Sequence, residues 1–189
     1  MVDNNNFKKP DIKFNPKKLR QATNALFTKV SWRHHIVKGL CLTQIPGDPC
    51  SAYGEKLRGV FWTKPDFAGQ EVQREKFIAE SQYTEFIEKY KGTFFEEIYT
   101  VLSKKYKLGR VRRLLLEPRT SLGWHRDPEA RLHVSIITNE GAPLVVDDSL
   151  IRLPADGHVW FADTRNYHTV FNGGEENRIH LVATYLGEK

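Results

Sequence analysis

Short apolar segments alternate with turn residues throughout the second half of the chain. From residue 110 onward this pattern predicts strands at 110–117, 131–138, 142–146, 149–152, 158–161, 167–171 and 178–186. Turn-forming clusters separate the segments, among them Pro154-Ala155-Asp156-Gly157 and Asn172-Gly173-Gly174. Evenly spaced short strands favour an antiparallel sandwich or barrel, of which a two-sheet jelly roll is the natural form. We therefore predict a mainly β fold with flanking helices.

The first half of the chain carries two helical patterns. Asn15-Pro16 offers a capping residue and then proline at the first helical position, and an apolar stripe predicts a short helix to about Thr28. Thr93 and Glu96 have the spacing of a capping box, which predicts a second helix ending near Leu108-Gly109. The apolar stripes comprise Leu19, Thr23 and Leu26 or Phe27 in the first helix, and Phe95, Ile98, Leu102 and Tyr106 in the second. We expect the second stripe to pack against the sheet.

The remaining segments define the expected domain organisation. Residues 36–43 are apolar and β-branched enough to form a strand, whereas residues 50–81 mix glycine, proline and charge and give no firm assignment. A length of 189 residues suits one domain. We expect a basic flexible leader at 1–15 and a single domain at 16–189, with a helical or irregular part at 16–109 and a β core at 110–189.

Positive charge is concentrated near the amino terminus. The net charge is +6, and residues 1–38 hold nine Lys or Arg against two Asp, which leaves the rest of the chain at −1. This basic segment would attract an acidic partner or nucleic acid. A solvated tail is the simpler interpretation, because no aromatic-interleaved nucleic-acid motif accompanies the charge.

Nothing in the sequence indicates a membrane or secreted protein. There is no run of 18 apolar residues and the first residues lack the apolar core of a signal peptide. Cys41 and Cys50 are the two cysteines, too few for a disulfide scaffold, and we expect reduced thiols. These features predict an intracellular, cytoplasmic protein with no membrane contact.

Candidate metal ligands stand in the stretch from Leu122 to Pro128 and further downstream. Residues two apart on an extended strand point the same way, so His125 and Asp127 can present an imidazole and a carboxylate to one point. His168 supplies a second imidazole. Two neutral imidazoles and one carboxylate form the ligand set that non-haem Fe(II) oxygenases use.

The order of these residues resembles the Fe(II)/2-oxoglutarate-dependent oxygenases. His168 follows Asp127 by 41 residues, and Arg178 follows His168 by ten. In that family an H-x-D/E triplet, a second His and, about ten residues later, an Arg or Lys occur in this order. The resemblance implies that Arg178 holds the distal carboxylate of 2-oxoglutarate, and that the jelly roll is a cupin-like double-stranded β-helix.

A closer resemblance is to the aspartyl/asparaginyl β-hydroxylase-like branch, carried by Arg131-Leu132-His133-Val134-Ser135-Ile136 and Asn177-Arg178-Ile179-His180-Leu181. It covers about residues 110–186. It implies that Arg131 and His133 contact the 1-carboxylate end of 2-oxoglutarate. Hydroxyl donors can be added there by Thr120, Ser121 or Ser135. The implied cofactors are Fe(II), 2-oxoglutarate and O₂, and the implied products include succinate and CO₂. Asp127 is a departure, because the animal hydroxylases that name the branch lack the metal carboxylate.

Strand periodicity gives an independent indication of a polar cavity. Arg131, His133 and Ser135 share one face of their predicted strand, and Arg178 and His180 share one face of theirs. A half-solvated strand would explain either pattern alone. Two such strands around the predicted ligands are better explained by a polar cavity inside the barrel.

The remaining candidates are residues of the substrate pocket and histidines that are not expected to bind the metal. Trp124, Arg126 and His180 are candidates for the substrate pocket. We expect His158 to have a structural role. For His180, a structural role is the alternative to a place in the substrate pocket. His34-His35 is not expected to bind metal, because adjacent strand residues face opposite ways.

Two other classes of protein remain open. A cupin-type module that binds a metal or small acid without redox chemistry would need both histidines but not Arg178. A nucleic-acid-binding protein would explain the basic segment but not the ligand series. Within the oxygenase interpretation we expect hydroxylation of a C–H bond in an amino acid, peptide or protein side chain.

Overall fold

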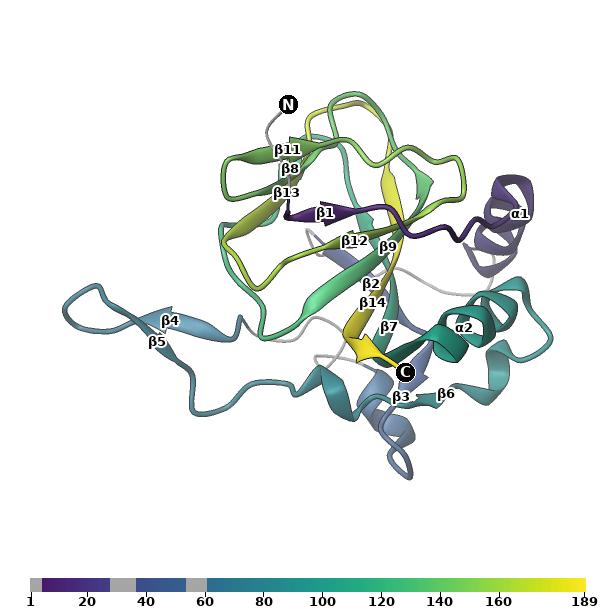
Figure 1. Cartoon of the computed structure of the whole chain (residues 1–189), viewed down its shortest axis with the longest axis horizontal. Coiled ribbons are helices and arrows are strands. Elements are labelled where there is room, and N and C mark those ends of the chain that lie inside the picture. The colour runs from purple at the N-terminus through teal and green to yellow at the C-terminus, as the bar shows by residue number, and fades with distance from the viewer. Residues whose placement is uncertain (1–4, 28–36, 54–60) are drawn as a thin grey trace.

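Two antiparallel sheets form the centre of the molecule (Figure 1). The computed structural model describes residues 5–27, 37–53 and 61–189. The larger sheet runs in the order β1 (Phe7–Lys8), β12 (Val159–Ala162), β9 (Ala130–Ile137), β14 (Arg178–Glu188), β7 (Tyr106–Leu116), β2 (Val37–Cys41). The smaller sheet runs in the order β11 (Ser149–Ile151), β10 (Leu144–Val146), β13 (His168–Asn172), β8 (Thr120–Ser121). This arrangement confirms the jelly roll and most of the predicted strands.

The larger sheet buries both of its faces. On its outer face the apolar residues of β9 and β14 pack with the two helices in one core, and each large apolar side chain buried there contributes about 1.5–3 kcal/mol. The members of this core include Leu132, Val134, Ile136, Ile179, Leu181, Leu19, Leu26, Phe95, Ile98 and Leu102. The alternate residues, such as Arg131, His133 and His180, face inward and are buried as well. The alternative explanation, in which the polar face of each strand meets water, is therefore wrong for both β9 and β14.

Both helices are present; the first agrees with its predicted range over the described residues, and the second ends earlier than predicted. Helix α1 (Pro16–Phe27) begins as expected, because the Asn15 side chain accepts hydrogen bonds from the amides of the first turn. Helix α2 (Phe94–Lys105) lacks the predicted capping box, since Thr93 donates to the Tyr90 carbonyl and Glu96 accepts from the Gly92 amide. It ends at Lys105 because β7 begins at the next residue. Among the described helices, none has both the length and the apolar character needed to cross a membrane.

The expectation of a loose leader is wrong for residues 5–15. Phe7 pairs with Ala162 of β12, and its side chain joins a core cluster between the two sheets. Phe14 is buried beneath α1 and α2, and its amide donates to the carbonyl of Gly157 at 2.8 Å. A Cβ at Gly157 would lie 1.9 Å from the Phe14 carbonyl oxygen, so glycine permits this approach. Burial of Phe7 and Phe14 thus holds this segment against the rest of the protein despite its polar composition.

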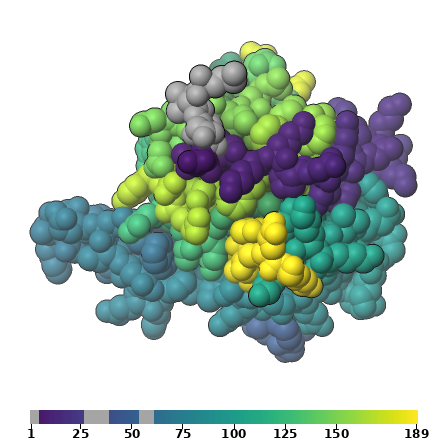
Figure 2. All heavy atoms as spheres, viewed as in Figure 1, coloured from purple at the N-terminus to yellow at the C-terminus, as the bar shows by residue number. Residues whose placement is uncertain are grey.

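The segment before α2 also adds to the β core. β2 forms an edge of the larger sheet and β7 begins at Tyr106, so the sheet extends beyond the predicted 110–189 boundary. β3 (Thr43–Gln44) pairs with β6 (Glu85–Phe86), and β4 (Thr63–Pro65) pairs with β5 (Glu71–Gln73). Short 3₁₀ turns occupy Pro49–Ala52, Glu80–Gln82 and Glu88–Tyr90. The β4–β5 hairpin projects from the body of the molecule as an arm of residues 61–74 (Figures 1 and 2).

Candidate metal centre and buried polar cavity

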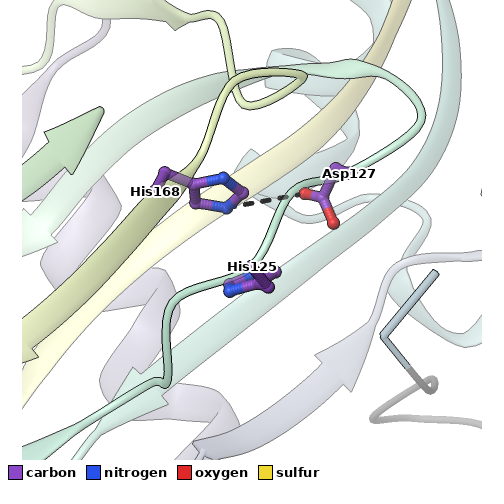
Figure 3. A group of neighbouring side chains, drawn as sticks. All are labelled: His125, Asp127 and His168. Carbon is purple, nitrogen blue, oxygen red and sulfur yellow. Dashed lines mark ion pairs between the residues drawn. The ribbon is translucent and has the colours of Figure 1, made fainter. Parts of the chain in front are cut away.

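His125, Asp127 and His168 converge on one point (Figure 3). Their potential ligand atoms all lie within 4.8 Å of one another, and both histidines are buried. Backbone pairing fixes this arrangement, because the amides of His125 and His168 donate to each other's carbonyls at 3.1 and 2.8 Å. The Asp127 amide donates to the Thr164 carbonyl at 2.8 Å. The extended geometry predicted from their spacing thus brings the three side chains together.

Hydrogen bonds set the ring orientation of both histidines. Nδ1 of His125 lies 2.7 Å from the Gly123 carbonyl oxygen, and Nδ1 of His168 lies 3.1 Å from that of Asn166. A carbonyl requires Nδ1–H as its partner, which leaves a lone pair on each Nε2. Burial and the nearby His125 lower the pKa of His168 to about 4, so this imidazole is neutral at physiological pH. The His168 ring therefore has the protonation state of a metal ligand.

Arg131 contacts the carboxylate of the cluster. Its Nη2 lies 2.9 Å from Oδ2 of Asp127, the oxygen that is 3.8 Å from Nε2 of His168. The same nitrogen lies 2.9 Å from Oε2 of Glu80. The side chain predicted to contact a co-substrate is thus already held between two carboxylates, next to the metal cluster.

A group of polar side chains lies buried on the inner face without hydrogen-bond partners. Among the described residues, no partner is found for either ring nitrogen of His133 or His180, for the Ser135 hydroxyl, or for Nε of Arg178. The His133 and His180 rings are 5.9 Å apart and nearly perpendicular. Burial, followed by the charges of Arg178, Arg131 and His168, holds the pKa of His133 well below its usual range. His133 therefore lies in electrostatic reach of both the metal cluster and Arg178.

Arg178 is a buried cation on the inner face. Its residue is 4% exposed, and it forms no ion pair with any residue in the described part of the chain. Burial lowers the pKa of Arg178 to about 9. A guanidinium in this state favours an anionic ligand, because such a ligand would restore the hydrogen bonds and charge balance lost on burial.

Three exposed aromatic residues contact the histidines of the metal cluster or directly precede them in the sequence. The ring of Phe61 stacks on His125 with centroids 4.6 Å apart, and it remains 41% exposed. Trp124 is 57% exposed and Tyr167 is 45% exposed, so both lie at the surface beside the two histidines. Sequence reasoning singled out Trp124 but missed Phe61, which belongs to the unassigned segment, and Tyr167, which stands only as the start of a predicted strand.

Arg126 joins the arm to the metal-binding segment. Its Nε lies 2.9 Å from the Glu71 carboxylate, and its guanidinium lies over the ring of Trp62 at 5.2 Å and near Tyr167 at 5.9 Å. These contacts join the arm to the segment that carries His125 and leave the turn of the arm exposed, where Phe67 is fully accessible.

The other histidines have separate roles or lie elsewhere. Nδ1 of His158 lies 2.9 Å from the Asp156 carboxylate, away from the cluster, which fits the expected structural role. His180 lies in the buried polar group described above. His34-His35 falls outside the described residues.

Solved structures share this fold at low sequence identity. The viral collagen prolyl hydroxylase of Paramecium bursaria Chlorella virus-1, solved as a 2OG complex, is 12% identical over 98% of both chains, with a TM-score of 0.52. IDO from Bacillus thuringiensis is 10% identical over 97% of this chain and 95% of its own, with a TM-score of 0.51. A Pseudomonas putida prolyl-4-hydroxylase scores lower, at 0.47, with 10% identity over 95% of this chain and 91% of its own. The first two likenesses show a common fold.

A family match covers the arm, the metal cluster and the buried polar group. No curated protein sequence matches the chain. The family model described as aspartyl/asparaginyl beta-hydroxylase matches residues 61–186, two thirds of the chain. The matched range therefore starts at the arm and extends well upstream of the residues that carry the resemblance. The chain belongs to the aspartyl/asparaginyl β-hydroxylase family.

Proposed function

We propose that the protein is an Fe(II)- and 2-oxoglutarate-dependent dioxygenase that hydroxylates a C–H bond of an amino acid, peptide or protein side chain and releases succinate and CO₂. The observation that carries the proposal is the set of buried, unpartnered polar groups beside the metal cluster. Buried polar groups in folded proteins nearly always have hydrogen-bond partners, so this set points to a ligand that supplies them. Family membership supports hydroxylation as the chemistry.

The donor set of the cluster fits Fe(II). Two neutral imidazoles and one carboxylate match the ligands of non-haem iron oxygenases and leave positions for other ligands. His125 and His168 would bind through Nε2, and Asp127 through a carboxylate oxygen. Bound iron, together with the keto acid and O₂, would supply the oxidising power for C–H hydroxylation.

The buried polar group fits the two ends of 2-oxoglutarate. Arg178 can donate two parallel hydrogen bonds to the far carboxylate, which a buried guanidinium does better than an ammonium. His133 is within electrostatic reach of both Arg178 and His168, which suits it to the part of the co-substrate nearer the metal. Ser135 and His180, paired across β9 and β14, would donate to the oxygens between these ends. These side chains would bind and orient the co-substrate and exclude water from it.

The exposed aromatic residues favour a peptide or protein substrate over a free amino acid. Phe61 stacks on His125, Trp124 and Tyr167 are exposed and directly precede the two histidines in the sequence, and Phe67 is fully accessible in the turn of the arm. A free amino acid would fill a small pocket and would leave such a surface unused. An extended polypeptide can contact both the arm and the aromatic residues beside His125.

Anaerobic binding and uncoupled turnover test the proposal without knowledge of the substrate. The protein should bind one Fe(II) per chain, and adding 2-oxoglutarate should produce a charge-transfer absorbance. With O₂ and ascorbate, it should release succinate above a metal-free control. His125→Ala, Asp127→Ala and His168→Ala should each weaken Fe(II) binding, because each removes one of the three ligands.

Two outcomes would contradict the proposal. Undiminished Fe(II) binding in all three variants would remove the metal site. Fe(II) binding without either 2-oxoglutarate-dependent absorbance or succinate would favour the cupin-type alternative, a module that holds a metal or small acid without redox chemistry.

A further inference from the structure

Glu80 is a buried carboxylate surrounded by three arginines. It begins a 3₁₀ turn, and its side chain is 11% exposed. Its carboxylate oxygens lie 2.7 Å from Nη2 of Arg112, 2.9 Å from Nη2 of Arg131 and 3.4 Å from Nη1 of Arg110. The Thr184 hydroxyl donates to the same carboxylate at 2.8 Å. Glu80 therefore lies at the centre of a charged cluster on the inner side of β7, β9 and β14.

One arginine of this cluster connects Glu80 to the candidate metal ligand. Nη2 of Arg131 is 2.9 Å from Glu80 Oε2 and 2.9 Å from Asp127 Oδ2, so a single nitrogen donates to both carboxylates. Nη1 of Arg131 donates to the Thr184 hydroxyl at 3.0 Å, which limits rotation of the guanidinium. The position of Asp127 is thus linked to that of Glu80 through one rigid planar group.

The backbone is shaped to allow this approach. A Cβ at Gly109 of β7 would lie 2.6 Å from the Glu80 carbonyl oxygen and 3.1 Å from Cα of Ser81. Any larger residue at position 109 would push the 3₁₀ turn away from β7. The absence of a side chain at this position therefore lets Glu80 reach the arginines.

We propose that Glu80 is a positioning residue of the metal centre, which acts through Arg131 to orient the Asp127 carboxylate and keep it available to the cation. The inference rests on the metal site of the proposed function. Glu80 does not belong to the ligand set, and no contact between it and His125 or His168 is observed among the described residues.

Charge balance gives the reason. Burial alone would raise the pKa of Glu80, but Arg112, Arg131 and Arg110 lower it to about 2, so this carboxylate is ionised at neutral pH. Without its charge, Arg131 would have Asp127 as its nearest anion, because the Glu129 carboxylate lies farther away at 3.8 Å. Asp127 would then be drawn toward Arg131, and excess positive charge would stand beside the cation.

The first experiment measures Fe(II) affinity by anaerobic titration with Fe(II) alone. Glu80→Gln keeps the size and hydrogen-bonding shape of the side chain and removes its charge. We expect it to weaken Fe(II) binding roughly 10- to 100-fold, the usual effect of removing a group that orients a metal ligand. Glu88→Gln is the matched control, because Glu88 is 83% exposed and pairs with Lys91. That variant should bind Fe(II) like the wild type.

A double variant separates positioning from a general structural role. If Glu80 acts through Arg131, then adding Glu80→Gln to Arg131→Met should change Fe(II) affinity by less than about threefold. An equal loss in both backgrounds would overturn the proposal, and so would wild-type affinity in Glu80→Gln. Thermal unfolding of each metal-free variant shows whether the affinities refer to folded protein.

Glu80→Asp provides a second variant in case Glu80→Gln does not fold. It keeps the charge and shortens the reach to Arg131, so we expect a folded protein with Fe(II) binding weakened about threefold or more. Unchanged affinity in Glu80→Asp would again overturn the proposal. Absence of Fe(II) binding in the wild type would instead contradict the proposed function, so the two failures are distinguishable.

Discussion

Replacing Arg178 by leucine should remove tight 2-oxoglutarate binding and stabilise the ligand-free protein. The side chain is almost completely buried and has no ion-pair partner among the described residues. Burial lowers its pKa from 12.5 to about 9. The unfolded chain therefore holds this proton more tightly than the folded chain does, so at neutral pH the buried charge destabilises the fold. At 1.36 kcal/mol for each pKa unit, the cost is on the order of 5 kcal/mol.

The size of the stability change depends on how well leucine replaces the buried part of the arginine side chain. Leucine keeps an apolar stem and removes the charge, so a net gain of about 2 kcal/mol remains after some packing is lost. For a chain of this length, this gain corresponds to a rise of about 4–8 °C in melting temperature. Loss of the desolvated guanidinium–carboxylate pair should cost about 2–5 kcal/mol of binding, or roughly 30-fold or more in 2-oxoglutarate affinity.

Two measurements on the same samples check the prediction. Thermal unfolding is followed without metal or co-substrate, and 2-oxoglutarate binding is measured by anaerobic calorimetry on the Fe(II)-loaded protein. Arg152→Leu is the control, because this arginine pairs with an exposed carboxylate, that of Glu140, and should affect neither value much. A lower melting temperature for Arg178→Leu would refute the unpaired-charge reasoning. Wild-type 2-oxoglutarate affinity would refute the role of Arg178.

The remaining predictions concern stability and the metal. Deleting residues 1–14 should lower the melting temperature markedly, because it removes β1 and the buried rings of Phe7 and Phe14, each worth about 1.5–3 kcal/mol; thermal unfolding of the truncated and full chains compares them. Glu80 has its pKa lowered from 4.5 to about 2, so its stabilisation of about 3 kcal/mol is complete above pH 4.5 and is lost as pH falls toward 2. Urea unfolding at several pH values should show a shallower acid dependence for Glu80→Gln. His168→Ala should lower the Fe(II) stoichiometry measured after anaerobic dialysis, whereas an unchanged stoichiometry would exclude this residue as a ligand.

Local periodicity explains why the β core could be predicted and the leader could not. The alternation of Arg131, His133 and Ser135 with apolar neighbours identifies β9 and its inward face from the sequence alone. The spacing of His125 and Asp127 likewise predicts that their side chains meet. Residues 5–15 carry no such period, and their order depends on Phe7 and Phe14 meeting distant strands and helices.

The parts of the site that sequence reasoning missed are held by long-range contacts. Glu80 precedes Arg131 by 51 residues and comes from a segment without a regular pattern, so nothing local indicates their ion pair. Phe61 stacks on His125 from the first residue of the arm, in a segment whose sequence has no regular pattern. Such contacts cannot be predicted from the residue types, because polar and aromatic residues are also common on protein surfaces. They form only once the complete fold brings the partners together.

The distribution of carboxylates over the inner face explains which arginine is left for an anionic ligand. Arg110 and Arg112 pair with Glu80, and Arg131 pairs with Glu80 and Asp127. In the part of the chain that the structure describes, Arg178 has no carboxylate beside it, although it is buried just as deeply. Bringing a dianion to Arg178 forms an ion pair without breaking another, whereas binding it at the other arginines would require competition with existing carboxylates. On the proposed function, the paired arginines would support the metal carboxylate, and Arg178 would be the arginine left to bind the far end of the co-substrate.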